Sequence, residues 1–575
     1  MATLRHAIAA MLLLGPCACG PAPVKPGGQA SPAARPNILL VSLDTVRWDH
    51  TSLAGYTRDT TPSLAELAAL PGSTTFERAY APAAWSLPAY ASLFTGRDAL
   101  SHGVGFLRSE LDPAHTTLAE ALSAYGYRTA AFTSGPHLIP ETGLGRGFAT
   151  HEHITAASPM TPAVNGALAW LDALDGEQPF FLTVVGYDAH TPYAAPAAFA
   201  ELYDPAYRGF LHQAENPVRD DPCELRGDTR TCMSFFPERF TDPSDAGADP
   251  DAPRLLVEPN LDWVKLPGGQ RVELRRDRSQ REAMRALLAA HRDGASVPID
   301  PSAAQRLASS SLGPLLEIGP DGARLVSSLV LVQASLSQGG FDPADTAHLV
   351  AHYDAAIRAA DLQLGRLLRE VEQRGLLDET IVVVLADHGE ALGEDLRFHH
   401  DDQVGDAVFH VPLVIRLPGA EASPRYDGLV TLTGLGPTLL QRLGIQPPAG
   451  TEVHSFLGAL DPRAPAPSVQ AVSGASLCCY WVRDEDWELR GRRVEGAEQG
   501  AALAWSLHRD GAPRDLAAEH PERVADLQRV IAAWPSHPGR FARFGAVEPG
   551  ADDPALRQAL RQGGYWSPEP REPSP

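Results

Sequence analysis

The sequence predicts an α/β protein built on a doubly wound, mostly parallel β-sheet with helices on both faces. Two observations carry this prediction: continuously apolar runs, typical of strands buried on both faces, and amphipathic helical patterns between them. Strands that alternate with such helices favour parallel pairing, because each helix carries the chain back across the sheet. The predicted strands are residues 37–43, 128–133, 180–185, 380–385 and 411–417.

The predicted helices are recognised by apolar residues that recur with the helical period. They cover residues 117–125, 163–174 and 349–372. In the last of these, the spacing of three or four places the apolar residues on one face, which indicates a helix packed against the sheet. These apolar positions are 353, 356, 357, 360, 364, 367, 368 and 371.

Three of the predicted strands run directly into acidic residues. Asp44 follows the first strand, Asp188 follows the strand at 180–185, and Asp387 follows the strand at 380–385. In open α/β sheets, ligands bind beyond the carboxyl ends of the strands. We therefore expect these acids to lie where a functional site forms.

Composition divides the chain into segments. The main α/β domain is predicted over 37–450, interrupted at about 208–340 by an insertion rich in Pro, Gly and acidic residues. A smaller C-terminal α+β region is predicted over 451–545, followed by a Pro-rich, disordered tail at 546–575.

The charge balance excludes one class of partner. The 575 residues include 48 Lys and Arg against 71 Asp and Glu, which gives a formal net charge of −23. Nucleic-acid binding needs clustered basic groups that displace counterions from phosphates, and the sequence has no such run. Lys25 and Lys265 are the only lysines in the sequence, so nearly all positive charge comes from arginine.

The N-terminus has the proportions of an export signal. Residues 1–19 combine a basic start with a short apolar stretch, and residues 20–36 are typical of a flexible tether. Cys17 or Cys19 is placed like the lipid-carrying cysteine of a bacterial lipoprotein, and the alternative is an ordinary secretory signal that is cut elsewhere. We expect an exported protein, either periplasmic or lipid-anchored in the bacterial cell envelope, whose membrane contact is limited to that anchor. In an oxidising compartment, Cys223 and Cys232 are candidates for a short-loop disulfide.

Two of the strand ends carry candidate metal ligands. Asp44 is either a metal ligand or a helix or loop cap. The adjacent Asp387 and His388, followed by Gly389, can present a carboxylate and an imidazole to one cation. The alternative for this pair is an exposed turn, because turns favour Asp and Gly.

Three further residues are candidates for catalysis or substrate binding. Ser86 precedes a proline and a helix-like stretch, so it would lie at a helix N-terminus that favours a bound anion. A simple helix N-cap is the alternative for this serine. His190 and His400 each lie in a polar motif, and either one taken singly would more often be a satisfied surface histidine.

Taken together and in this order, these motifs resemble the sulfatase family of the alkaline-phosphatase superfamily. The most specific parts are Ser-x-Pro-x-x-x-Ser-Leu-Phe-Thr-Gly, which begins at Ser86, and Asp-His-Gly-Glu-x-Leu-Gly-Glu, which begins at Asp387. The resemblance extends from about residue 36 to 419 outside the insertion, and continues weakly to about 534. It implies an alkaline-phosphatase-like fold and a sulfatase-like catalytic domain.

The resemblance also implies roles for the candidate residues. Asp44, Asp387 and His388 resemble the family's metal ligands, and Ser86 occupies the position of a metal-bound nucleophile. His190 resembles a histidine that binds the ester or protonates its leaving group, and His400 resembles a second histidine near the anion. The ion would be divalent: calcium, manganese or zinc.

The chain departs from the family pattern at three places. Tyr90 occupies the arginine position of the motif that directs conversion of Cys or Ser to formylglycine, so Ser86 is expected to remain a serine. Thr45 replaces a second acidic ligand and is only a weak ligand candidate. The family's lysine in a Gly-Lys motif is absent where this chain reads Gly-Pro-His at 135–137.

These observations predict a metal-dependent hydrolase of sulfate or phosphate esters that acts on a sulfated or phosphorylated small molecule or glycan. A plain serine gives weight to phosphorus esters, so a phosphodiesterase or phosphoglycerol-type transferase of the same fold is one alternative. A catalytically silent, glycan- or anion-binding protein is the other alternative, because several charged groups of the family are missing.

Overall fold

The computed structural model describes residues 35–207 and 343–532, with short gaps in both ranges, and a few short strands between them. The predicted signal and tether, Cys17, Cys19, Cys223, Cys232, most of the insertion and the C-terminal tail lie outside the described residues. The predicted segmentation of the chain therefore stays a prediction. Among the described residues, no helix has the length and apolar character needed to cross a membrane.

A nine-stranded, mostly parallel sheet forms the centre of the protein and confirms the predicted fold class. Its order is β16-β2-β15-β12-β1-β5-β3-β4, and β17 also pairs with β2. The strands are β1 (Asn37–Leu43), β2 (Ser73–Tyr80), β3 (Arg128–Thr133), β4 (Thr150–His153), β5 (Phe180–Gly186), β12 (Thr380–Leu385), β15 (His410–Arg416), β16 (Arg425–Tyr426) and β17 (Val430–Thr431). Strand β15 runs antiparallel to both of its neighbours, β12 and β2.

The register of the central strands places their carboxyl ends level with one another. Strand β1 pairs in parallel with β12 on one side and with β5 on the other, so that Ser42 lies opposite both Leu385 and Val185. The residues that follow β1, β5 and β12 therefore leave the sheet at the same edge.

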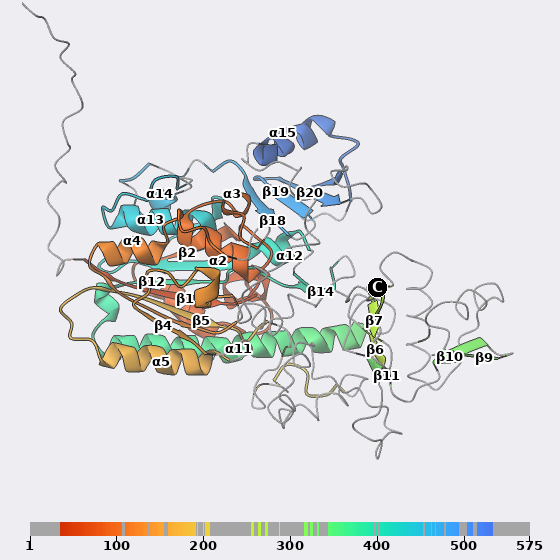
Figure 1. The fold of residues 1–575 in the computed structure, drawn as a ribbon, viewed down its shortest axis with the longest axis horizontal. Coiled ribbons are helices and arrows are strands. Elements are labelled where there is room, and N and C mark those ends of the chain that lie inside the picture. The colour runs from red at the N-terminus through yellow and green to blue at the C-terminus, as the bar shows by residue number, and fades with distance from the viewer. Residues whose placement is uncertain are drawn as a thin grey trace, which may run out of the picture.

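Helices cover both faces of the sheet (Figure 1). On one face, α11 (Pro343–Gln373) contacts α5 (Met160–Asp172) and α1 (Pro62–Ala69). On the other face, α2 (Ser86–Thr95) contacts α4 (Leu118–Ala124) and α13 (Leu435–Arg442). The three predicted helices correspond to α4, α5 and α11, the last beginning six residues earlier than predicted. Helices of a single turn are α3 (Ala99–His102), α12 (Asp406–Phe409) and α14 (Leu457–Leu460).

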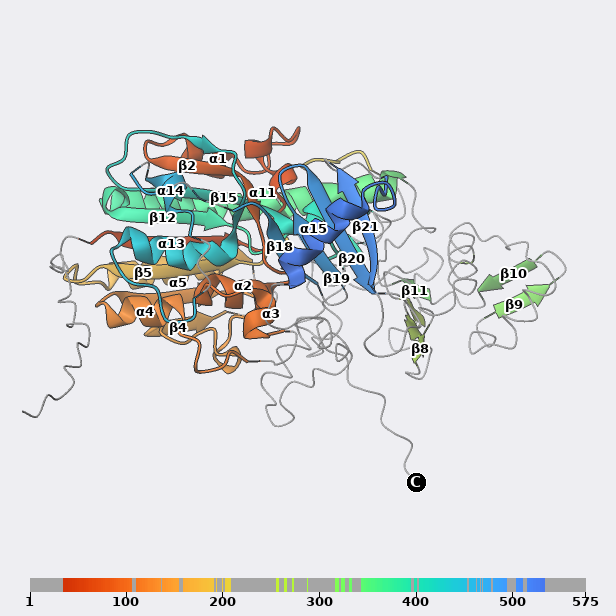
Figure 2. The ribbon, with the colours of Figure 1, turned by 90° about the horizontal axis from the view of Figure 1, so that it is seen from above.

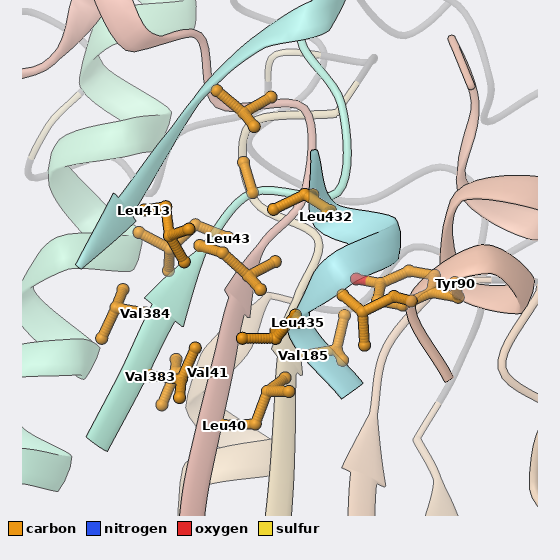
Figure 3. Packing of buried hydrophobic residues seen from close by; sticks show 14 of the residues in the cluster. Leu40, Val41, Leu43, Tyr90, Val185, Val383, Val384, Leu413, Leu432 and Leu435 are labelled. Atoms are coloured by element: carbon orange, nitrogen blue, oxygen red, sulfur yellow. The ribbon is translucent and has the colours of Figure 1, made fainter. Parts of the chain in front are cut away.

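The core lies between the central strands and these helices. Leu40, Val41, Val383 and Val384 are fully buried and interleave across neighbouring strands (Figure 3). Burial of one such side chain contributes about 1.5–3 kcal/mol before the entropy of ordering it is subtracted. This packing fixes the strand ends rigidly, which is what a site built on them requires.

A separate antiparallel sheet of four strands follows the main sheet (Figure 2). It consists of β18 (Val472–Ala475), β19 (Cys479–Arg483), β20 (Trp487–Arg493) and β21 (Leu503–Arg509), with α15 (Pro521–Ala532) packed on β19 and β20. Its first strand reaches the loop before α2, where Ala83 forms a parallel bridge with Ala475. The ring of Trp481 also stacks on Phe409 at 4.8 Å. This sheet therefore supports the segment that leads into Ser86.

Short strands lie outside these two sheets. They are β13 (Ala391–Leu392), β14 (Phe398–His399), β6 (Leu255–Val257), β7 (Trp263–Lys265), β8 (Arg271–Glu273), β9 (Leu316–Gly319), β10 (Gly322–Leu325) and β11 (Val330–Val332). The last six fall within the predicted insertion.

Replacement of Asp361 by alanine should destabilise the fold. This buried carboxylate on α11 accepts hydrogen bonds of 2.9 Å from the backbone N–H groups of Ser63 and Leu64, at the start of α1. Because Asp361→Ala leaves both donors without this acceptor, we expect a loss of about 2–4 kcal/mol in the free energy of unfolding, measured by urea denaturation. The matched control is Asp378→Ala, which removes an ion pair to Arg416 from a side chain that is 90% exposed and should cost under about 1 kcal/mol. Equal losses in the two variants would contradict this account of the contact between the helices.

Candidate functional site

The candidate site forms where two neighbouring strands end and one helix begins. Asp44 directly follows β1, and Asp387 and His388 follow β12, the parallel neighbour of β1. Ser86 is the first residue of α2. The expected gathering of the strand-end acids is therefore seen for Asp44 and Asp387.

The serine hydroxyl lies between an acid and an imidazole. Ser86 Oγ donates a hydrogen bond of 3.2 Å to Asp44 Oδ2 and lies 3.1 Å from His388 Nε2. His388 Nε2 is also 3.5 Å from Asp387 Oδ2 and 3.9 Å from Asp44 Oδ1. All four residues are at most 2% exposed, so these groups interact out of contact with bulk water.

This cluster has the composition of a divalent metal site. One ligand atom each from Asp44, Asp387 and His388 lies within 4.8 Å of the others. Asp44 Oδ1 and Asp387 Oδ2 are buried and accept no hydrogen bond from the described residues. The Nδ1 atom of His388 lies 2.9 Å from the Gly389 carbonyl, so that Nδ1–H donates there and leaves the Nε2 lone pair for an ion.

The pKa shifts of the cluster also favour a bound divalent ion. Burial, followed by the nearby Asp387, raises the pKa of Asp44 well above its ordinary value. Burial also raises the pKa of Asp387, to about 6. Burial, followed by the nearby His400, holds the pKa of His388 well below its ordinary value, so this imidazole is neutral and able to act as a ligand. Two buried carboxylates beside a neutral imidazole are stabilised by a cation.

The structure excludes the simpler alternatives for these residues. Trp85 occupies the N-cap position of α2, and the Ser86 side chain points instead to Asp44 and His388. Asp44 Oδ2 accepts from that serine rather than capping a helix. His388 is fully buried, so the exposed-turn interpretation of the Asp-His pair is wrong.

Thr45 contributes its backbone to the site. It is one of two residues other than glycine, among those described, with a positive φ, at 59°. Its N–H donates to Asp387 Oδ1 at 3.4 Å, and its hydroxyl donates to the Asp44 carbonyl at 2.7 Å. Its own carbonyl accepts from the Tyr353 hydroxyl at 2.7 Å. The Thr45 hydroxyl proton is thus donated to the backbone carbonyl of the preceding residue.

Glycine is required after His388 by close packing. A Cβ atom on Gly389 would lie 2.2 Å from the carbonyl oxygen of Ala407 in α12. The Gly389 N–H donates to the Val408 carbonyl at 2.9 Å. These contacts fix the turn that holds His388 in position.

The other two predicted histidines lie beside the cluster. The ring centroid of His400 is 4.4 Å from that of His388 and 5.1 Å from that of His190. His190 stacks on Tyr187, which follows β5, at 4.1 Å. Both predicted histidines are at most 4% exposed, so neither is a surface histidine. The structure thus brings all the main predicted site residues together.

One acidic residue of the site, Glu390, was not predicted from the sequence. Glu390 is fully buried, and its Oε1 lies 3.1 Å from Nδ1 of His400. The sequence did contain a signal for this residue, because Glu390 is the last residue of the Asp-His-Gly-Glu motif. His399, which precedes His400, is the second described residue other than glycine with a positive φ, at 70°. Glu390 therefore orients the His400 ring against a strained backbone.

The residues that depart from the family pattern are buried near the site. Tyr90, in the arginine position, is buried among the core side chains (Figure 3). Its hydroxyl donates to Ser42 Oγ at 2.8 Å. His137 is also buried, and its ring contacts Trp85 edge-on with the centroids 5.6 Å apart. His137 lies close enough to contribute to the lowered pKa of His388. An imidazole therefore lies near the site in the stretch where the family has a lysine.

Comparison with known proteins identifies the family. The sequence model described as "Sulfatase" matches residues 36–445, which is most of the chain. The chain belongs to the sulfatase family.

Curated sulfatases share only part of their length with this chain. Arylsulfatase K of Bos taurus is 34% identical over 119 residues, which cover 21% of this chain and 22% of that protein. The chain thus matches about a fifth of the length of this sulfatase relative.

Solved structures show the same fold over more of the chain. A phosphonate monoester hydrolase of Agrobacterium radiobacter aligns with a TM-score of 0.57 and 18% identity, covering 87% of this chain and 95% of its own. A protein in complex with its substrate D-glucosamine-2-N,6-O-disulfate aligns with a TM-score of 0.56 and 18% identity, covering 94% and 100%. At this identity the likeness establishes the sulfatase fold.

Asp188, expected among the strand-end acids of the site, instead accepts a hydrogen bond at the start of a helix. Its Oδ2 accepts from the Met160 N–H at 2.8 Å, at the start of α5. Although the residue as a whole is partly exposed, desolvation of the carboxyl group raises its pKa to about 7.

This pKa predicts a pH dependence of stability. Between about pH 4 and pH 7, the folded protein holds a proton on Asp188 that the unfolded chain has lost, so stability falls as the pH rises through this window. Asp188→Asn keeps an acceptor for Met160 and removes the ionisation. We expect the variant to lose less thermal stability than the wild type between pH 5 and pH 8, measured by melting temperature. Parallel melting curves across this range would contradict the raised pKa.

Proposed function

We propose that this protein is a metal-dependent hydrolase of sulfate or phosphorus esters in which Ser86 is the nucleophile. The observation that carries the proposal is the position of Ser86 Oγ, held between Asp44 Oδ2 at 3.2 Å and His388 Nε2 at 3.1 Å in a buried cluster. A serine that acted only as a helix N-cap would not need these two partners.

Asp44, Asp387 and His388 would hold the divalent ion. When bound, such an ion lowers the pKa of a nearby hydroxyl and neutralises charge on the ester oxygens. Calcium, manganese and zinc all remain candidates, because the donor set combines two carboxylates with one imidazole.

The chain's own residues account for the remaining steps. A bond forms from Ser86 Oγ to sulfur or phosphorus while the bond to the ester oxygen breaks, and the serine proton passes to Asp44 Oδ2, which accepts its hydrogen bond at 3.2 Å. His190 donates a proton to the departing alkoxide, and His400, oriented by Glu390, contacts the anion. Water then cleaves the serine ester, which releases sulfate or phosphate and restores the hydroxyl.

The substrate proposed is a sulfated or phosphorylated small molecule or glycan. Two neighbours of the same fold support this class: one was solved with a disulfated glucosamine, and another is a phosphonate monoester hydrolase. Tyr90 is buried in the core, and its burial raises the pKa of its hydroxyl well above the ordinary value, so this side chain stays neutral where the family has a positively charged arginine. The imidazoles and the cation would therefore bind the anion.

Replacement of the nucleophile tests this function. Ser86→Ala should lower kcat/KM by at least about 10³-fold on whichever substrate is turned over, among matched aryl sulfate, phosphate monoester, phosphodiester and phosphonate ester. The matched control is Ser92→Ala, which removes another buried hydroxyl of α2 that lies 2.9 Å from His102 Nε2, away from the cluster. The control should keep most of the activity.

The outcomes separate the alternatives. Turnover of phosphorus esters alone would assign a serine-type phosphohydrolase within the family, and turnover of sulfate alone would assign a sulfatase. Activity that survives Ser86→Ala would contradict the nucleophile. Full metal binding without turnover of any ester would favour the anion-binding alternative.

A further inference from the structure

A second group of histidines lies at the start of α11, outside the cluster described above. His348 and His352 are four residues apart, so their side chains lie on one face of the helix. They are 3% and 4% exposed. Two histidines at this spacing on a helix are a recurring arrangement of metal ligands.

The two imidazoles approach each other through their Nε2 atoms. His348 Nε2 and His352 Nε2 are 3.2 Å apart, with their rings at 76°. Two nitrogens bound to one tetrahedral zinc ion at about 2.0–2.1 Å are separated by about 3.4 Å. The observed separation therefore matches two ligands of one ion.

The tautomer of His348 is set by an acid. Its Nδ1 lies 3.0 Å from Asp204 Oδ2, and an ionised carboxylate only accepts hydrogen bonds, so Nδ1–H donates and Nε2 carries the lone pair. A carboxylate that orients a histidine in this way is the usual partner of a metal-binding imidazole. Tyr207 stacks on His348 with the ring centroids 3.8 Å apart, which fixes the imidazole further.

We propose that His348 and His352 form a second metal site that binds a zinc-type ion, with Asp204 as the positioning residue. Imidazole nitrogens select zinc and its neighbours over calcium, which prefers oxygen ligands. The two nitrogens leave two positions of a tetrahedral ion for water or an oxygen ligand.

The site would join distant parts of the chain. Asp204 and His348 are 144 residues apart and lie on either side of the predicted insertion. Tyr353, which follows His352, donates to the Thr45 carbonyl beside the candidate active site. An ion on Nε2 would make the Nδ1–H of His348 a stronger donor, and would thereby strengthen the contact between Asp204 and the helix that supports the Asp44 loop.

Zinc stoichiometry tests the proposal. The full-length chain carrying Asp387→Asn, which removes one ligand of the first cluster, is stripped with a chelator, dialysed against zinc chloride and analysed by mass spectrometry. We expect one more zinc per chain than in the same protein with His348→Gln and His352→Gln. Asp204→Asn should weaken the zinc affinity of this site by about 10-fold or more.

Control variants and a second measurement keep the proposal falsifiable. His508→Gln in the same background changes a histidine of the second sheet that lies 3.0 Å from Ser506 Oγ, and should retain the zinc. X-ray absorption of the Asp387→Asn protein with one equivalent of zinc should show two imidazole ligands, a result that needs no histidine variant. Equal zinc content with and without the pair, or an ion without two imidazoles, would overturn the site and leave a hydrogen bond between the two rings as the explanation.

Discussion

The rest of the structure depends on one electrostatic constraint, the burial of two carboxylates at the ends of neighbouring parallel strands. Asp44 and Asp387 are at most 2% exposed, and each has an oxygen without a hydrogen bond from the described residues. A protein tolerates such a pair only when protons or a cation compensate the charge. The raised pKa values of both acids correspond to compensation by protons. The nearby His388 nitrogen provides a further ligand for compensation by a cation.

Much of the surrounding structure holds this unfavourable arrangement in place. Thr45 adopts a left-handed backbone conformation that costs about 1–2 kcal/mol for a residue with a β-branched side chain, and its three hydrogen bonds offset that cost. His399 shows the same kind of strain beside His400. Gly389 allows α12 to approach so closely that the loop after β12 has little freedom. Strain in the described backbone thus gathers where the functional side chains lie.

Much of the fold was predictable because burial on both faces leaves a clear signal. The boundaries of β1, β3 and β12 agree with the apolar runs in the sequence. Strand β2 was missed because it begins with Ser73, Thr74 and Thr75, polar residues that are buried here but do not form an apolar run. The antiparallel direction of β15 was also missed, because direction depends on pairing across the sheet and not on local composition.

The candidate site was predictable as a set of residues, whereas its supporting contacts were not. Sequence motifs identified Asp44, Ser86, Asp387 and His388, which two adjacent strands and the start of α2 bring together. The role of Glu390 depends on the fold of the β13–β14 hairpin, whose pairing places Ala391 opposite His399. The pairing of His348 with Asp204 joins residues far apart in the chain, and no local pattern reports such a contact.

The most direct test of the central claim is the anomalous diffraction of crystals grown with manganese. The account predicts one anomalous peak within about 2.0–2.6 Å of Asp44, Asp387 and His388, with Ser86 Oγ facing it. At saturating manganese, the absence of a peak there, with Asp44 and Asp387 remaining side by side, would contradict it. The acid pair would then be compensated by protons, and the proposed chemistry of Ser86 would lose its basis.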